Sequence, residues 1–533
     1  MKSIANTQNN AMSELKTLVS ELQSQLEKAH QVIDQQSTQI NSLQHQIHLF
    51  RTAKFGRRSE KSNVDDIQGR LFDDLDDNTV SQEAESSDTE ETITYTRKKR
   101  SGRKDLPKSL PYVENIQDIE ESEKQCACGC ELTHIGDDIS EKLDVLPQVT
   151  FRVVNIKRKY ACRTCEETVK VAKAKKQAFP KSIATPGLVS AIIDAKYNRH
   201  LPLYRQEEIF KDMKADINRS NLSNWIIKAS KLLEPLVDLM IEKIQNYDIA
   251  YADETTLQVV NEKDKSSSSK SYMWCFIGGP PDKECSVYQY HPSRKEHIAQ
   301  EFFAPFKGYL HADCYRAYVN LDGRNIKHVA CFAHARRYFM DIVKSNKNKT
   351  GLANIAVKKI GELYKVEREL KEKNATPDEI FNTRQNKSLP ILNDFYEWLE
   401  VKSLKVPPKS PIAKAIHYAI KHWDALNRYT LDGRLDIDNN KAERTVKPFV
   451  IGRKNWLFCQ NEKGANAGAI LFSLVQTCKQ HNVDVFAYFK LALQNIITCQ
   501  TKEELISLLP FNCSTNDLEA QRSAPELIYP EKK

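Results

Sequence analysis

The sequence contains no long apolar segment. Its opening stretch, "MKSIANTQNNAMSELK", lacks the apolar core of a secretory signal peptide. Nowhere do about 18 apolar residues follow one another, as a membrane-spanning helix requires. The 13 cysteines are an odd number, and several stand alone, such as Cys275 and Cys331, which suits a reducing compartment. We therefore expect a cytoplasmic protein with no membrane partner.

A strong excess of one charge is also missing. Lys and Arg number 79 and Asp and Glu 71, so the net charge is only +8. This balance weakly favours an anionic partner but does not identify one. At 533 residues, of which 40% are hydrophobic, the chain is longer than one core usually supports, so several domains are expected.

Glycine and proline are absent from residues 11–50, where a heptad pattern runs without a break. One core position carries Met12, Val19, Leu26, Ile33, Ile40 and Ile47, and the other carries Leu15, Leu22, Ala29, Gln36, Leu43 and Phe50. Mostly β-branched residues at the first position and mostly leucine at the second favour a coiled coil of two parallel helices, with Gln36 fixing the register. We predict a dimerising coiled coil over 11–52; an amphipathic helix packed on its own protein is the alternative.

Residues 53–108 have the composition of a linker, first acidic and then basic. The stretch 73–92 is rich in Asp, Glu and Ser and too polar to offset the entropy of ordering, which predicts disorder. The run "RKKRSGRK" at 97–104 suits a DNA backbone through counterion release. A solvated charge run neutralised by the acidic stretch is the other interpretation.

Cysteines cluster only in the segment 109–178, as "CACGC" at 126–130 and "CRTC" at 162–165. A structural zinc site needs four soft ligands in a tetrahedron. We predict Cys126, Cys128, Cys162 and Cys165 as zinc ligands, with Cys130 or His134 as substitutes in the first pair. A redox pair is the alternative for the CxxC cysteines.

Residues 180–245 are expected to be helical. "PLYRQEEIFKDM" and "RSNLSNWIIKAS" predict two helices joined by a turn, with Asn218 or Ser220 as the cap of the second. Leu222, Trp225 and Ile226 would then face a core. The exposed side of the second helix would present Arg219, Asn221, Asn224 and Lys228 to a DNA groove. A plain helical hairpin fits the same pattern.

Two carboxylates are associated with predicted strands. Asp253 lies on the apolar face of a strand over 248–260 and needs neutralisation, a partner or a metal unless the strand end is exposed. Two further strands, "SYMWCFIGG" and "CSVYQYHPS", and a helix, "KEHIAQEFF", follow. Asp313 ends a short strand over 308–312. "KHVACFAHARRYF" then predicts a strand leading into a helix that carries His334, Arg336 and Arg337.

A third carboxylate stands among cations in "DIDNNKAERTVKPFVIGRKNWLF", residues 436–458. Glu443 is surrounded there by Lys441, Arg444, Lys447, Arg453 and Lys454. A surface helix in which Glu443 pairs with Lys447 one turn on is the simple explanation, at about 0.2–0.5 kcal/mol. Trp456 is a candidate for stacking on a base, or else part of the core of a strand.

The order of three antiparallel strands, helix, strand, helix and strand resembles the ribonuclease-H-like fold of DDE recombinases. More narrowly, the chain resembles the insertion sequence 66 family of bacterial DDE transposases over roughly residues 12–500. The ordered motifs are "FGRRSEK", the CxC and CxxC pairs, "HLPLYRQEEIF", "YADETTLQV", "HADCYRAY", "CFAHARRYF", "NNKAERTVKPFVIGRKNWLF" and "GAILFSLVQTCKQHNVDVFAYF". One departure is CxCGC at the first cysteine pair, where many relatives carry CxxCG.

The resemblance implies an α/β protein with a ribonuclease-H-like catalytic core at 246–460, interrupted by a mainly helical insertion at 345–425. A C-terminal helical element at 461–510 and a tail at 511–533 would follow. The implied catalytic residues are Asp253, Asp313 and Glu443, holding two Mg²⁺ (or Mn²⁺) ions about 3.5–4 Å apart. Water would cut each element end, and the freed 3′-OH would attack target DNA. His334, Arg336, Arg337, Arg444, Lys447, Arg453 and Lys454 would hold phosphates.

The implied partners are the transposon ends and the target DNA, a second copy of the chain, and accessory proteins of the same element. The implied location is the bacterial nucleoid. A non-catalytic, dimeric, zinc-containing DNA-binding regulator is the competing hypothesis. A nuclease of the same fold without strand transfer is another.

Overall fold

The computed structural model describes residues 176–523, except 264, 267–268, 324 and 346–350, together with 150, 151, 153 and the backbones of two short strands. These strands, β1 (Lys159–Ala161) and β2 (Val169–Val171), form an antiparallel pair. The chain divides into two compact units, one at 79–153 and one with the rest, and the helices and strands of the described residues belong to the latter. The predicted coiled coil, the linker and the zinc ligands Cys126, Cys128, Cys130, Cys162 and Cys165 lie outside the described residues.

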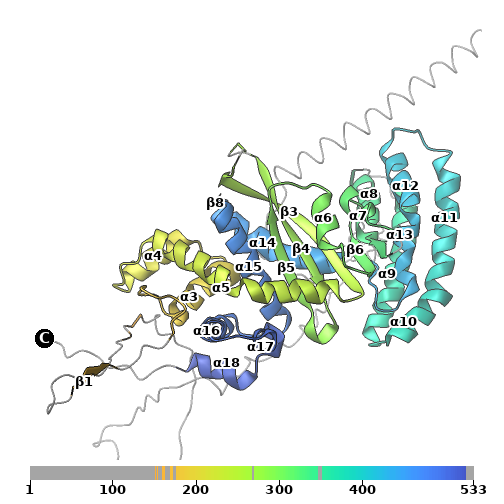
Figure 1. Cartoon of the computed structure of the whole chain (residues 1–533). Coiled ribbons are helices and arrows are strands. Elements are labelled where there is room, and N and C mark those ends of the chain that lie inside the picture. Colours follow the sequence, from red (N-terminus) through yellow and green to blue (C-terminus); the bar gives the residue numbers. More distant parts are fainter. Residues whose placement is uncertain are drawn as a thin grey trace, which may run out of the picture. The chain divides into compact units, whose positions relative to one another are not determined.

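A mixed sheet forms the centre of the described fold (Figure 1). Its strands are β3 (Ile249–Asn261), β4 (Lys270–Gly278), β5 (Cys285–His291), β6 (Gly308–Ala312), β7 (Ile326–Ala330) and β8 (Cys459–Asn461). The strand order is β5-β4-β3-β6-β7, and β8 pairs with the far end of β3. Strands β3, β4 and β5 are antiparallel, whereas β6 and β7 run parallel to β3.

The helices between these strands are α6 (His297–Phe302), α7 (Arg316–Val319) and α8 (Phe332–Ser345). The predicted succession of three antiparallel strands, helix, strand, helix and strand is therefore confirmed. At the start of β3, Ile249, Ala250, Tyr251 and Ala252 are all buried, so both faces of the sheet are covered there. Helices α5 (Arg219–Gln245), α14 (Asn440–Trp456) and α15 (Glu462–Gln480) pack against the sheet.

The helical region before the sheet begins with α3 (Pro186–Ile193) and α4 (Leu203–Asp212), followed by α5. Asn218 caps α5 by accepting a hydrogen bond from the Asn221 amide at 2.9 Å, so one of the two predicted caps is confirmed. Leu222, Trp225 and Ile226 are buried, as predicted. Helix α5 is 27 residues long and ends shortly before β3, so it connects the helical hairpin to the sheet.

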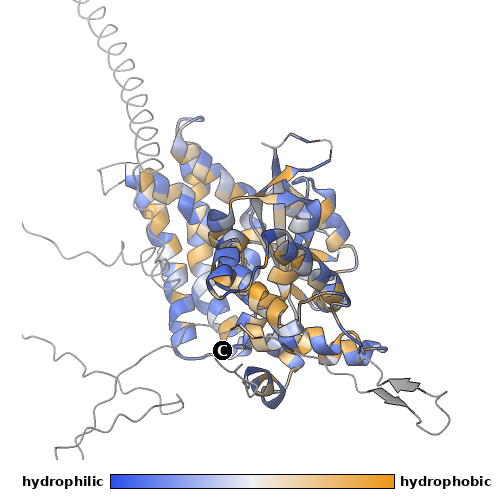
Figure 2. Ribbon diagram, turned by 90° about the vertical axis from the view of Figure 1, so that its left-hand side faces the viewer, coloured by the Kyte–Doolittle hydropathy of each residue, from blue (hydrophilic) through white to orange (hydrophobic). Residues whose placement is uncertain are grey.

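A helical insertion separates α8 from α14. It comprises α9 (Leu352–Glu372), α10 (Pro377–Thr383), a π-helical turn (Arg384–Ser388), α11 (Leu389–Ser403), α12 (Pro411–Lys421) and α13 (Trp423–Asn427). Hydrophobic and hydrophilic residues are mixed along the helices of the described fold, as expected when one face of a helix is buried and the other exposed (Figure 2). Trp456, considered for a strand, is instead the last residue of α14, and β8 begins only at Cys459.

The chain continues after β8 with α15, α16 (Val485–Asn495), α17 (Lys502–Ser507) and α18 (Thr515–Arg522). Helix α18 lies in the segment expected to be a tail. Ser514 caps it by accepting from the Asp517 amide, and Arg522 pairs with Asp484 at the start of α16. Among the described residues, no helix is long and apolar enough to cross a membrane.

A buried histidine makes the stability of this sheet sensitive to acid. Both ring nitrogens of His311, on β6, are buried without a hydrogen-bond partner, and the ring stacks on Tyr251 at 4.6 Å. Burial is the main cause that lowers the pKa of His311 to about 4. Between pH 6.5 and 4, His311 is protonated in the unfolded chain but stays neutral in the folded chain. The free energy of unfolding therefore falls as the pH falls through this range.

We expect His311→Phe, which keeps the stack on Tyr251, to remove this acid sensitivity. Relative to the wild type, the variant should gain about 3 kcal/mol as the pH falls from 7 to 4. Denaturant unfolding at both pH values measures the difference. An equal pH slope in the two proteins would show that His311 takes up its proton in the folded state.

Candidate active site

The register of the sheet brings Asp253 and Asp313 to the same level on neighbouring strands. Tyr251 of β3 pairs with His311 of β6, and the two strands are parallel. Each aspartate follows its paired residue by two positions, so both side chains lie on the face of the stacked Tyr251 and His311 rings. The short β6 ends at Ala312, which frees Asp313 at the strand end, while β3 continues past Asp253.

Local hydrogen bonds fix both aspartates. Asp253 Oδ1 accepts from the amide of Glu254 at 2.9 Å, and Asp313 Oδ1 accepts from the amide of Tyr315 at 3.0 Å. The ring of His328, on β7, contacts the carbonyl of Asp313 at 3.1 Å. These bonds hold the loop that follows β6 against β3 and β7.

Glu443 lies in the first turn of α14, and its charge contributes to raising the pKa of Asp253. Asn439, the residue before the helix, donates its side-chain amide to the carbonyl of Ala252 at 3.0 Å and its backbone amide to Cys331 Sγ at 3.2 Å. The start of α14 is therefore fastened to β3 one residue before Asp253. In α8, His334 Nδ1 lies 3.6 Å and an Arg337 nitrogen 3.8 Å from Glu443 Oε1.

Negative charge accumulates where these elements meet. Burial is the first cause that raises the pKa of Asp253 well above its usual value, and the charges of Glu254, Asp313 and Glu443 add to it. Glu443 Oε1 and His334 Nδ1 are buried without a hydrogen-bond partner. A carboxylate oxygen without a hydrogen bond, beside mutually repelling carboxylates, fits a divalent cation bound through hard oxygen ligands.

A second donor set shares Glu443. Ligand atoms of Cys331, His334 and Glu443 all lie within 4.8 Å of one another, so these three could also hold a metal ion. Cys331 is fully buried, and burial raises the pKa of its thiol, which disfavours the thiolate that would bind a metal. Mg²⁺ prefers oxygen ligands, so the carboxylates of Asp253, Asp313 and Glu443 suit it better than the set of Cys331, His334 and Glu443.

A network that the sequence did not suggest connects the two aspartates. The buried carboxylate next to Asp253, that of Glu254, forms an ion pair with Arg294 and accepts a hydrogen bond from Tyr318. The guanidinium of Arg294 lies 3.8 Å over the ring of Tyr315, whose hydroxyl donates to the carbonyl of Arg294. Because the Tyr315 amide holds Asp313, the chain of contacts runs from one aspartate to the neighbour of the other.

For the metal-dependent cleavage that the family resemblance implies, we expect Arg294→Gln to lower the maximal rate by roughly 10- to 100-fold, since small displacements of reacting groups have effects of this size. The Mg²⁺ concentration that gives half of the maximal rate should not rise, because the substitution removes a positive charge. Arg316→Gln is the matched control, because Arg316 is 82% exposed and pairs with Glu296 at 3.6 Å. A lower melting temperature with an unchanged rate would contradict a positioning role.

The predicted phosphate-binding residues divide into several groups. Arg337, Arg444 and Lys454 are exposed, and Lys447 is half-buried. Arg453 is half-buried, and one of its guanidinium nitrogens contacts the hydroxyls of Thr255 at 3.3 Å and Thr256 at 2.9 Å, which ties the end of α14 to β3. His334 faces Glu443 rather than solvent.

The prediction that Arg336 binds DNA phosphates is wrong for this structure. Arg336 is fully buried in α8, so it is not available to DNA. In α8, residue 336 falls on the face that also buries Phe339 and Met340, whereas Arg337 falls on the open face. The pattern of cations in the sequence could not separate two adjacent arginines.

The helical hairpin keeps its predicted polar face. Arg219, Asn221, Asn224 and Lys228 are all exposed on the first three turns of α5. The backbone amide of Arg219 donates to Glu207 of α4 at 2.8 Å, which fixes the angle between the two helices.

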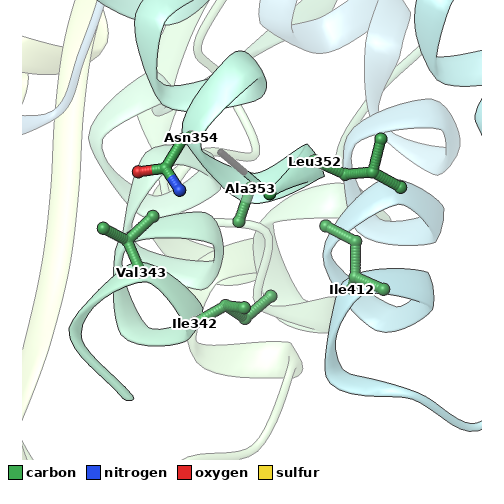
Figure 3. Close-up of a pocket in the computed structure, with 7 residues that line it drawn as sticks. Ile342, Val343, Leu352, Ala353, Asn354 and Ile412 are labelled. Carbon is green, nitrogen blue, oxygen red and sulfur yellow. The ribbon is translucent and has the colours of Figure 1, made fainter. Parts of the chain in front are cut away.

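An apolar hollow of about 180 Å³ lies in the helical insertion, between the ends of α8, α9 and α12 (Figure 3). Ile342, Val343, Leu352 and Ile412 line it, with Asn354 as the polar exception. Aliphatic walls offer neither metal ligands nor phosphate donors, so the acids and not this hollow are the candidate active site.

Comparison with known families finds matches in four segments of the chain. The model described as "Transposase IS66 family" matches residues 181–467, more than half of the sequence. "Transposase C of IS166 homeodomain" matches 42–114, "zinc-finger binding domain of transposase IS66" matches 123–166, and "IS66 C-terminal element" matches 473–511. The zinc-finger match includes every cysteine predicted as a zinc ligand.

Similar chains occur in Sinorhizobium fredii. The uncharacterized protein y4jD is 30% identical over 504 residues, which cover 91% of this chain and 97% of that protein. The uncharacterized protein y4hP is 28% identical over 507 residues, with coverages of 89% and 88%. The uncharacterized protein y4qI is 32% identical over 431 residues, with coverages of 76% and 79%.

Proposed function

We propose that this chain, which belongs to the IS66 family of transposases, cuts DNA at the ends of its element and joins them to a target by a DDE mechanism. The observation that carries the proposal is electrostatic: the charges of Asp313 and Glu443 both raise the pKa of Asp253. Asn439 also fastens the helix of Glu443 to the strand of Asp253. The strand order β5-β4-β3-β6-β7, with acids on β3 and after β6, supports a ribonuclease-H-like core.

The three carboxylates would hold Mg²⁺ or Mn²⁺. When bound, these ions activate an attacking oxygen and stabilise the leaving oxygen of a phosphodiester. The residues of this chain supply the rest. Asp253 and Asp313 provide oxygens at one level of the sheet, and Glu443 closes the site from α14. Arg337, exposed beside Glu443, is positioned to hold a phosphate oxygen.

DNA binding would extend beyond the acids. Arg444, Lys447 and Lys454 follow Glu443 along α14, and the polar face of α5 offers Arg219, Asn221, Asn224 and Lys228 to a groove. Cysteines at 126, 128, 162 and 165 would hold structural Zn²⁺, and the heptads at 11–52 would join two copies. Two copies would allow both element ends to be held together, with accessory proteins of the element as further partners.

Incubation of the full-length protein with a labelled duplex of the element's end, a supercoiled target plasmid and Mg²⁺ tests the proposal. We expect nicking that leaves a 3′-OH, followed by a product in which the end is joined to the plasmid. Tight binding without cutting in Mg²⁺ or Mn²⁺ would support a DNA-binding regulator instead. Nicking without a joined product would leave a nuclease and remove strand transfer.

A further inference from the structure

Helix α14 ends in an unusual turn. Leu457 has φ 65° and ψ −53°, and the amide of Phe458 donates to the carbonyl of Trp456 at 2.8 Å. This three-residue hydrogen-bonded turn is the rare, strained form of the γ-turn. A positive φ is ordinary for glycine, whereas a residue with a bulky side chain in a sparsely populated region is destabilised by about 1–3 kcal/mol. A leucine at this position therefore needs a reason.

The two residues of the turn project apolar side chains into solvent. Leu457 is 63% exposed and Phe458 is 45% exposed. The residue before them is anchored: the Trp456 ring packs against Phe449 at 5.6 Å, with the ammonium of Lys196 at 5.6 Å. Single exposed apolar residues are common, but two adjacent ones on a strained, anchored turn are not explained by packing. We refer to Leu457 and Phe458 as the 457–458 tip.

Two cations precede the tip along the chain. Arg453 and Lys454 occupy the last turn of α14, and Lys454 is exposed. Arg453 is tied to Thr255 and Thr256, two and three residues beyond Asp253. At 1.5 Å per residue the tip lies about 20 Å from Glu443 along α14, a distance that about six base pairs span. A duplex held at the acids and along α14 would therefore pass the tip.

We propose that the 457–458 tip is an apolar wedge that enters between stacked bases of the DNA bound along α14. Among ligands of cationic surfaces, DNA is the one whose interior is apolar and accessible between base steps. DNA-binding proteins use leucine and phenylalanine in this way to unstack and kink a duplex. The position of the DNA rests on the proposed function. The turn, its exposure and its cations do not.

Backbone strain provides a test that separates function from structure. Leu457→Gly removes the wedge side chain and also relieves the positive φ, so it should be at least as stable as the wild type. A role in packing predicts the opposite, a loss of stability. The double variant Leu457→Gly/Phe458→Ala removes the whole tip. Leu404→Ala is the matched control, because Leu404 is 89% exposed and follows directly on α11 of the helical insertion.

The measurement is the fluorescence of 2-aminopurine placed at successive positions of a duplex of the element's end, with full-length protein and without added Mg²⁺ or Mn²⁺. We expect one step, roughly six base pairs from the cleavage site, to brighten severalfold with the wild type and with Leu404→Ala. The double variant should not brighten it and should bind the duplex roughly tenfold more weakly. A mismatch at that step should restore tight binding of the duplex by the double variant.

These outcomes separate the wedge from the chemistry. Brightening by a protein that does not cut DNA in Mg²⁺ would support the wedge and remove the proposed mechanism. Cleavage without brightening at any position would overturn the wedge alone. Equal brightening by the double variant would overturn it as well. So would a change of oligomeric state in the double variant without a change in fluorescence, because the tip would then contact protein.

Discussion

Asp253→Asn is expected to lower Mg²⁺-dependent DNA cleavage by at least roughly 1000-fold while DNA binding is retained. Loss of one carboxylate from a three-acid metal site removes about 4 kcal/mol or more of transition-state stabilisation. Asparagine has nearly the same shape and can still accept the hydrogen bond that Glu254 donates to Oδ1. Gel-shift affinity and cleavage of the same labelled duplex measure the two properties separately.

Asp253→Asn should also stabilise the folded protein when no Mg²⁺ is bound. Burial, with the charges of Glu254, Asp313 and Glu443, raises the pKa of Asp253 well above its usual value. At a pH below the pKa of Asp253 in the unfolded chain, the carboxyl is neutral in both states, and its burial does not lower the stability through charge. As the pH rises from there through the folded pKa, the unfolded chain releases its proton more readily and stability falls. Asparagine cannot ionise, so the variant escapes this loss at neutral pH.

Mg²⁺ should reverse that order. It should raise the melting temperature of the wild type, whose carboxylates it binds, and raise that of Asp253→Asn much less. Glu262→Gln is the control, since Glu262 is a buried carboxylate just past the other end of β3 that is held by Ser271, Tyr290 and Lys265. It should change stability without changing the Mg²⁺ dependence of cleavage. Equal cleavage by wild type and Asp253→Asn would end the metal mechanism.

The sequence predicted the elements whose signals are local. Alternation identified β3, the brief strand 308–312 matched β6, and the Asn218 cap marked the start of α5. These signals depend on neighbouring residues, so periodicity and capping chemistry find them. The grouping of the three acids came from the resemblance to a family, because no local pattern relates β3, β6 and α14.

Tertiary contacts decided what the sequence left open. Arg336 and Arg337 are adjacent cations that the sequence does not distinguish, yet Arg336 is buried and Arg337 is exposed. Arg294 was not predicted, because its partners Glu254 and Tyr315 lie on other elements. Arg384 was also missed, since its segment carried no signal beyond a polar helix. Buried charges of this kind are fixed by partners far along the chain.

Arg384→Met is expected to lower the free energy of unfolding by about 3–5 kcal/mol, the usual effect of breaking a buried ion pair. Arg384 is 2% exposed and pairs with Glu367 of α9 at 2.7 Å. Its guanidinium also donates to the carbonyls of Tyr429, Asp432 and Leu435, at 2.7, 3.0 and 2.9 Å. The substitution would leave the Glu367 carboxylate without its countercharge and three carbonyls without this donor. Denaturant unfolding measures the loss.

The carbonyls that Arg384 binds belong to the return segment 428–439, which leads directly into α14 and Glu443. We therefore expect Arg384→Met also to raise the Mg²⁺ concentration required for cleavage, because Glu443 is held less firmly. Arg384→Met/Glu367→Met should recover much of the stability, since it replaces the ion pair with apolar groups, but not the Mg²⁺ affinity. Arg434→Met is the control: Arg434 pairs with Asp248 and Asp432 at a 39% exposed site, where about 1 kcal/mol or less is expected. If the double variant regained both properties, Arg384 would act through stability alone and the helical insertion would have no part in placing the third acid.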